Sequence, residues 1–322
     1  MDHPLLEMSL STPVIFMIFN RPDLTSAVFA EISRAKPRKL LVVADGPRFP
    51  EEAPKCLEAR RVIENVDWNC DLKTNFAEEN MGCKSRIASG LDWAFCIVEE
   101  AIILEDDCLP TPSFFPFCEK LLDHYRFDKR VMHIGGVNFQ IGRPKPSSTY
   151  YFSKYTHVWG WASWRRAWKY YDCEMTSWPE FKKSGMLNHF CQDPFELSHW
   201  TSVFEQVYSG AIDTWDYQWL YACWTQNALS ILPSSNLVSN IGFRSDATHT
   251  YGGSPIADLA TEDIWKLHHP NFMVADPVAD RFTFNNILGG NRMREAATLR
   301  ARIHRILARV KNRLTKKRGN PV

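Results

Sequence analysis

The sequence lacks the short motifs that mark three large classes of enzyme. No G-x-G-x-x-G follows the first apolar segment, and neither G-x-x-x-x-G-K-[ST] nor G-x-S-x-G occurs in the 322 residues. These patterns form dinucleotide-binding turns, phosphate-binding loops and nucleophile elbows. Dinucleotide-dependent oxidoreductases, P-loop enzymes and α/β-hydrolases are therefore disfavoured.

The chain also lacks long apolar runs and paired cysteines. Its apolar stretches, such as residues 14–19 and 93–98, are far shorter than the ~18 residues that a membrane-spanning helix needs. Residues 1–4 (M-D-H-P) carry no basic region before an apolar core, so we expect no secretory signal. The nine cysteines are odd in number and none are spaced as C-x-x-C, which disfavours a zinc knuckle or disulfide framework. The sequence thus predicts a cytoplasmic protein with reduced cysteines.

Overall composition is that of a folded protein, but the charge is unevenly distributed. Apolar residues make up 45% and charged residues 23%, which excludes a disordered chain. Residues 291–322 hold eleven Lys and Arg and one acid, a net of +10, so the rest carries −9 against +1 overall. Apolar residues recur at helical spacing within this tail, which predicts a basic amphipathic helix.

Two partners for the tail stay open at this point. Residues 291–318 would bind an anionic membrane surface, at the inner membrane face, or would pack on the acidic body of the chain or on a protein partner. We expect no nucleic-acid partner. No Pro/Gly/Ser-rich linker divides the remainder, so residues 1–290 are expected to form one unit.

Strand and helix patterns alternate along the first half of the chain. Apolar runs at 14–19, 39–44, 101–104 and 131–139, with a weaker one at 70–77, alternate with helical patterns at 24–33, 52–65, 83–98 and 112–125. Such alternation predicts an α/β fold with a mainly parallel central sheet and helices on both faces. Ligands of these sheets bind where the strands end, at their carboxyl edge.

Three consecutive carboxylates, Glu105, Asp106 and Asp107, follow one of these strands. They repel one another, and burying them is costly unless a cation offsets their charge. A partly hydrated divalent ion shared with a diphosphate would do so. The alternative is a solvated acidic turn that caps the helix expected near Pro112.

Two more strand ends carry polar groups. Asp45, in D-G-P, follows the second strand and can accept hydrogen bonds from a base or ribose. Arg21, in N-R-P-D, follows the first strand and offers a cation to a phosphate. Both patterns also suit plain turns, but the three strand ends together place polar groups along one edge.

Other candidates lie further along the chain. Asp216, between Trp215 and Tyr217, is either a general base or the N-cap of a helix over 217–224. His249 is a candidate metal or phosphate ligand, or an exposed loop histidine. Nine of the twelve tryptophans lie between 159 and 224, as core packing or as faces for sugar rings.

Taken in order, these segments resemble a known family. The series N-R-P, A-D-G-P, N-M-G-C-K, I-L-E-D-D, W-G-W, W-D-Y-Q-W and A-T-H-T is similar to the GT-A nucleotide-sugar glycosyltransferases over about residues 12–252. The likeness is to a bacterial branch related to eukaryotic N-acetylglucosaminyltransferase I. It implies a GT-A fold and an inverting enzyme dependent on Mn²⁺ or Mg²⁺. The enzyme would move a hexosyl or N-acetylhexosaminyl group from a nucleotide diphosphate donor, commonly UDP-linked, to a glycan or lipid-linked glycan in polysaccharide biosynthesis.

The resemblance also implies residue roles. Asp107 would bind the metal directly, and His249 would be a further metal ligand. Asp45 would recognise the uracil and Arg21 would lie near the diphosphate. The full set of donor-binding residues would be Arg21, Asp45, Lys84, Glu105 and Asp106.

Asp216 would be the catalytic base, and Trp159, Gly160 and Trp161 would border the acceptor. The eukaryotic relatives have W-D-D-W, whereas here Tyr217 follows the first acid. This departure leaves a single acid, Asp216, where those relatives have an adjacent pair.

Two other functions stay open. A sugar-phosphate nucleotidyltransferase also uses an α/β sheet, carboxylates and Mg²⁺, but it needs a glycine-rich basic loop after the first strand, and residues 20–23 hold no glycine. A catalytically inactive module would bind a sugar nucleotide or glycan without turnover.

Overall fold

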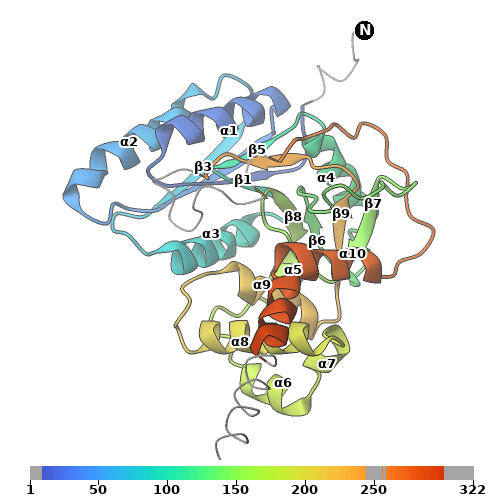
Figure 1. Ribbon diagram of the computed structural model, residues 1–322. Coiled ribbons are helices and arrows are strands. Elements are labelled where there is room, and N and C mark those ends of the chain that lie inside the picture. The colour runs from blue at the N-terminus through green and yellow to red at the C-terminus, as the bar shows by residue number, and fades with distance from the viewer. Residues whose placement is uncertain (1–8, 244–255, 257–258, 301–322) are drawn as a thin grey trace, which may run out of the picture.

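The computed structural model describes residues 9–243, 256 and 259–300, and an eight-stranded sheet forms its centre (Figure 1). The strand order is β3-β2-β1-β4-β8-β6-β9-β7. The strands are β1 (Val14–Ile18), β2 (Lys39–Ala44), β3 (Asp71–Phe76), β4 (Glu100–Glu105), β6 (Val131–Gly135), β7 (Tyr150–Ser153), β8 (Trp161–Trp164) and β9 (Leu229–Pro233).

The sheet is mainly parallel, as predicted. Strands β3, β2, β1 and β4 run parallel to one another, and β6 runs parallel to β9. β8 is antiparallel to β4 and β6, and β7 is antiparallel to β9. A separate antiparallel pair joins β5 (Cys108–Pro110) to β10 (Val238–Asn240).

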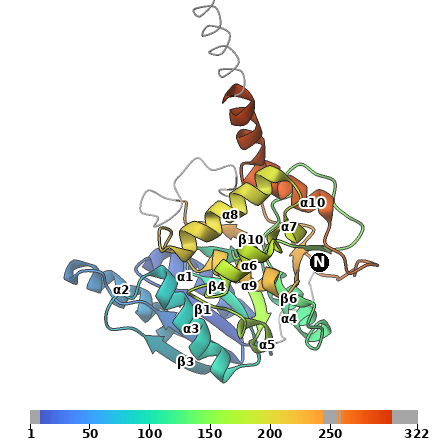
Figure 2. The same cartoon turned by 90° about the horizontal axis from the view of Figure 1, so that it is seen from below.

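Helices cover both faces of the sheet (Figures 1 and 2). They are α1 (Pro22–Ala35), α2 (Ala53–Arg61), α3 (Cys83–Ile97), α4 (Phe114–His124), α5 (Arg165–Trp168), α6 (Trp178–Ser184), α7 (Leu187–Phe190), α8 (Pro194–Tyr208), α9 (Asp216–Thr225) and α10 (Pro277–Phe282). The α/β prediction is thereby confirmed.

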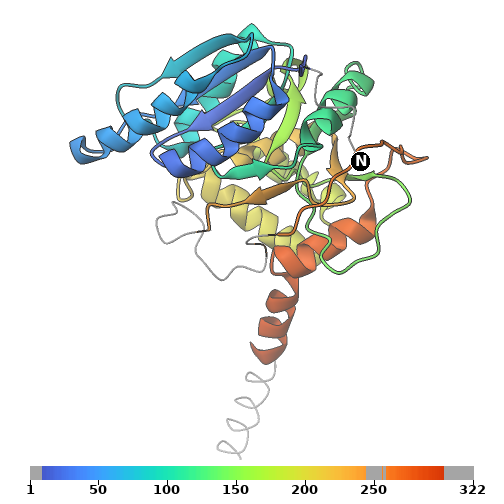
Figure 3. The same cartoon turned by 90° about the horizontal axis from the view of Figure 1, so that it is seen from above.

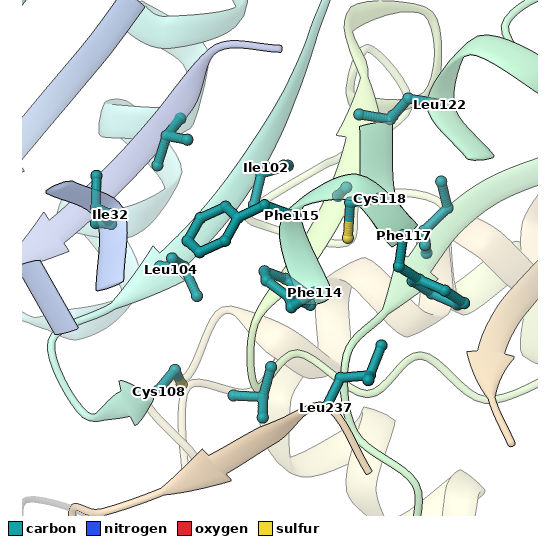
Figure 4. Packing of buried hydrophobic residues seen from close by; sticks show 14 of the residues in the cluster. Ile32, Ile102, Leu104, Cys108, Phe114, Phe115, Phe117, Cys118, Leu122 and Leu237 are labelled. Carbon is teal, nitrogen blue, oxygen red and sulfur yellow. The ribbon is translucent and has the colours of Figure 1, made fainter. Parts of the chain in front are cut away.

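Alternate residues of the central strands enter two different cores, because successive side chains of a strand point to opposite faces. Phe16 of β1 packs with α1 and α4, whereas Ile15 packs with α3, α5 and α9. Figure 4 shows the first of these cores, with Phe114 and Phe115 of α4 beside Leu104 of β4. Burial on both faces explains why β1, β2 and β4 are apolar on both faces except at strand ends.

The tryptophans serve mainly as core residues. Eight of the nine between 159 and 224 are buried: Trp161, Trp164, Trp168, Trp178, Trp200, Trp215, Trp219 and Trp224. Some pack on the sheet, and others join α6, α8 and α9 in a third cluster. Core packing is therefore the confirmed interpretation for most of them.

The described part of the tail is helical over residues 290–300 and extends away from the body (Figures 2 and 3). Leu299, on this helix, is exposed. Residues 301–322 lie outside the described part, so the amphipathic helix over the whole tail and the division at residue 290 stay predictions. Within the described ranges, no helix has both the length and the apolar character to cross a membrane.

Candidate active site

The carboxyl ends of β2, β1 and β4 are neighbours in the sheet. The chain therefore brings three predicted groups to one edge: Asp45 after β2, Arg21 after β1, and the triad that begins with the last residue of β4. This placement follows from parallel pairing and was expected from the alternating pattern.

Arg21 pairs with two of the three carboxylates. It occupies the N-cap position of α1, where Pro22 starts the helix. Its Nη2 forms an ion pair with Asp106 Oδ1, and its Nη1 lies 3.1 Å from Asp107 Oδ2. The amide of Phe19 also donates to Asp106, at 3.4 Å. One guanidinium thus offsets two of three adjacent carboxylates, which leaves an excess of negative charge.

Asp106 is not part of a solvated turn. Its residue exposure is 3%, and burial raises its pKa to about 6 despite the opposing attraction of Arg21. Helix α4 begins only at Phe114, with Ser113 at its N-cap position. The alternative of an acidic turn that caps this helix is therefore wrong.

Glu105 shows the same excess charge. Glu105 keeps a small accessible surface. The protein atoms packed around its carboxyl group remove most of its solvation, and this raises its pKa well above the usual range. Asp107, Asp106 and Asp216 raise the pKa further, and Arg21 opposes them. A bound cation would relieve this repulsion.

The chemistry of these residues suits a cation that also has ligands from outside the protein. Among the residues described, no group of three or more His, Cys, Asp or Glu side chains could hold a metal ion by itself. Mg²⁺ in particular usually binds through one or two carboxylates, with water and substrate phosphates filling the other positions. Asp107, whose side chain is 14% exposed, is a carboxylate of the triad that can reach such a cation.

The segment after β10 holds the backbone of Asp107 in place. The amide of Ile241 donates to the Asp107 carbonyl at 2.8 Å. A side chain at the next residue, Gly242, would overlap the Asp107 carboxylate. Glycine at 242 therefore allows the chain after β10 to pass directly beside the triad. His249, the other predicted metal ligand, lies outside the described residues.

Asp45 organises the loop before α3. It is 7% exposed, and its Oδ1 accepts hydrogen bonds from the amides of Gly46 (2.8 Å) and Met81 (2.9 Å). Asn80 donates to Oδ2 at 2.9 Å. Burial raises the pKa of Asp45, and the hydrogen bonds from the Met81 and Gly46 amides oppose that effect. A side chain at Gly46 would overlap the backbone of Glu79, so the A-D-G and N-M-G segments can meet only with glycine there.

Carboxylates from several segments act electrostatically on Cys83, the first residue of α3. Burial raises the pKa of the Cys83 thiol far above its usual range, and the carboxylates of Glu105, Asp216, Asp213 and Asp45 raise it further. These four carboxylates are therefore all within electrostatic range of Cys83. Sequence analysis did not single out Cys83 or Asn80, although both belong to the N-M-G-C-K segment.

Asp216 is the first residue of α9 rather than its N-cap. The N-cap position belongs to Trp215, and Thr214 Oγ1 donates a hydrogen bond to Asp216 Oδ1. The N-cap interpretation of Asp216 is therefore wrong. Its carboxylate is half-buried and lies within electrostatic range of Glu105.

Lys84 is the second residue of α3, directly after Cys83. Its Nζ pairs with Glu174 Oε1 at 3.0 Å, and Asp213 also contributes to its raised pKa. The predicted contact of Lys84 with a donor would have to compete with Glu174, whose side chain is largely exposed.

The W-G-W segment contributes mainly to packing. Trp161 is 1% exposed, and its ring stacks on Trp215 (centroids 5.7 Å apart) and on His133 (5.4 Å). Direct contact of Trp161 with an acceptor does not fit this burial. The Trp161 ring instead packs against Trp215, the residue before Asp216. Trp159 is half-buried and packs edge-on against Phe139. Gly160, at φ +60°, accepts a hydrogen bond from the Gly136 amide at 2.7 Å.

Comparisons with known proteins add little to this geometry. No protein-family model and no curated protein matches the chain. Among solved structures, a UDP-glucose pyrophosphorylase complexed with UDP-glucose matches with a TM-score of 0.26 and 13% identity. The match covers 44% of this chain and 62% of that enzyme. A similarity this low carries no functional argument.

Proposed function

We propose that the protein is an inverting glycosyltransferase of the GT-A type. It would bind a nucleoside-diphosphate sugar, UDP-linked, together with Mn²⁺ or Mg²⁺ at the carboxyl edge of the sheet, and transfer the sugar to a glycan or lipid-linked glycan. The observation that carries this proposal is the triad at 105–107, which has excess negative charge, shares a sheet edge with Asp45 and lies within electrostatic range of Asp216.

Each group at this edge has a role in the proposed reaction. A divalent cation, when bound, stabilises negative charge that develops on the diphosphate leaving group. Asp107 would hold that cation, and Arg21 would fix the neighbouring carboxylates. Asp45 would accept a hydrogen bond from the base.

Asp216 would take the proton of the acceptor hydroxyl while that oxygen attacks the anomeric carbon from the face opposite the diphosphate. Direct displacement inverts the configuration. No covalent sugar–enzyme intermediate is then needed, unlike in the retaining hydrolases with two carboxylates.

A nucleotidyltransferase is less compatible with the first strand end. The loop after β1 is short, has no glycine, and runs directly into α1 at Pro22. Its basic residue, Arg21, is turned to the carboxylates of Asp106 and Asp107.

Release of the nucleoside diphosphate tests the proposal. With Mn²⁺ and a panel of UDP-sugars, we expect UDP to be released, faster with glycan acceptors than with water alone. Pyrophosphate consumption with a UDP-sugar would instead indicate a nucleotidyltransferase. Tight binding of UDP-sugars with no release on any acceptor would indicate an inactive binding module.

The basic tail is expected to bring the enzyme to an anionic membrane. Each basic residue near such a surface contributes ~1 kcal/mol, and burial of the apolar stripe adds to this. Changing Arg302, Arg305 and Arg309 to Glu should therefore abolish co-sedimentation with anionic vesicles, and salt should weaken binding by the unchanged protein.

A matched control places the same charge change on the body, at the exposed residues Arg61, Lys129 and Lys183. This control should still bind vesicles. Equal sedimentation of all three proteins, or indifference to lipid charge, would contradict the membrane role. It would favour packing of the tail on the acidic body or on a partner.

A further inference from the structure

A cavity of about 570 Å³ lies apart from the carboxylate edge. Its lining comes from the residue after β7, from the α7–α8 region and from α10, and Figure 2 shows α7 and α8 near α10. None of the residues that line it belongs to the candidate active site. Its volume lies within the range of roughly 300–1,000 Å³ that is usual for small-molecule sites.

The polar groups of the cavity are rigidly held. Lys154 Nζ lies 2.8 Å from Glu196 Oε1 and donates to the Phe190 carbonyl at 2.6 Å. Tyr155 also donates to Glu196 Oε1. Asp280 accepts hydrogen bonds from Ser153 Oγ (2.5 Å) and the Lys154 amide (3.2 Å). Buried polar groups held in this way are pre-organised for a ligand.

The charges of the lining largely cancel. Lys154 neutralises Glu196, and Asp193 pairs with Arg294 from the first turn of the tail helix. Asp280 is the remaining acid, and Arg281 of α10 lines the same cavity. With opposite charges balanced, the site favours an uncharged ligand over an anion or a metal ion.

The lining also offers one accessible aromatic ring. Phe190 is partly exposed, whereas Phe284, which also lines the cavity, is 1% exposed with Arg294 over its ring. Carboxylate oxygens accept hydrogen bonds from hydroxyls, an ammonium group donates to them, and aromatic faces pack against C–H groups. A sugar ring presents hydroxyls at its rim and C–H groups on its faces.

We propose that this cavity binds a neutral saccharide. The saccharide would place hydroxyls on Glu196, Asp280 and Lys154 and a C–H face on the ring of Phe190. Binding here requires no transfer reaction, so the inference goes beyond the proposed function and stands separately from it.

Filling the cavity tests this site in the full-length protein. Ala275 lines the cavity, whereas its neighbour Val274 does not and is 70% exposed. Ala275→Phe should lower saccharide affinity about tenfold or more, and Val274→Phe should leave it unchanged. The probes are cellobiose, maltose, lactose and N,N′-diacetylchitobiose. Saturation-transfer NMR measures the binding of each to the protein.

Glu196→Gln provides a second variant that keeps the side-chain size and should also weaken binding. Thermal unfolding checks that each variant is folded, and UDP binding with Mn²⁺ should be unchanged in all of them. If none of the four saccharides binds the unchanged protein, or if binding survives both Ala275→Phe and Glu196→Gln, the proposal is overturned. Neither outcome concerns UDP binding or UDP release. Failure of the saccharide proposal is therefore distinguishable from failure of the proposed transfer activity.

Discussion

Replacement of Asp107 by Ala is expected to remove cation-dependent binding of a UDP-sugar. Asp107 pairs with Arg21 through Oδ2, and its partly exposed side chain can reach a cation shared with a diphosphate, whereas Asp106 is buried. We expect a loss of about 100-fold or more in donor affinity, equivalent to ~2.7 kcal/mol. Calorimetric titration of UDP-sugar in the presence of Mn²⁺ measures it directly.

The fold should tolerate this change. Asp107 repels Glu105, so its removal relieves a repulsion, and Arg21 keeps its ion pair with Asp106. The melting temperature of Asp107→Ala should therefore be close to that of the unchanged protein. Asp123→Ala, which removes an exposed carboxylate on α4, is the matched control and should bind normally. Unchanged donor affinity of the native protein in a chelator would show that the metal assignment is wrong.

Strand ends were predictable because their signals are local. The runs at 14–19, 39–44 and 101–104 correspond to β1, β2 and β4 within one residue at each end. Each has an apolar interior, as buried parallel strands do, and each is followed or bounded by polar residues. Parallel pairing of these strands places Arg21, Asp45 and the triad at one edge. This placement could therefore be predicted from the strand pattern alone.

The second half was less predictable because its contacts are distant in sequence. β7 and β8 have only four residues each, too few to show a clear period. β8 lies between β4 and β6, antiparallel to both, and this order depends on pairing across tens of residues. The strand expected over 131–139 ends at Gly135, since the next amide turns to the Gly160 carbonyl.

The environment of each candidate residue also depends on distant partners. Asp45 is held by Asn80 and Met81, more than thirty residues away. Trp161 belongs to a motif that suggested an exposed acceptor site, yet Trp215 and His133 cover it. Local sequence indicated which residues stand at the edge, and tertiary packing determined which of them are accessible.

Replacement of Asp216 by Asn is expected to lower kcat by about 10²- to 10⁴-fold, the usual contribution of a positioned general base. The amide is nearly isosteric, and its oxygen can still accept the hydrogen bond from Thr214. It cannot take a proton from the acceptor hydroxyl at neutral pH. Donor and cation binding should be largely retained, because Asp216 belongs to α9 and contributes least of the neighbouring carboxylates to the charge at Glu105.

Asp213→Asn is the matched comparison for this prediction. Asp213 is exposed, lies in the same segment before α9, and also acts electrostatically on Cys83. Rates of UDP release at saturating donor and acceptor would be compared for both variants. If Asp216→Asn keeps most of its turnover while Asp213→Asn loses it, Asp213 is the base. If both keep it, the proposed inverting reaction with a carboxylate base from this segment is wrong, because neither acid takes the proton.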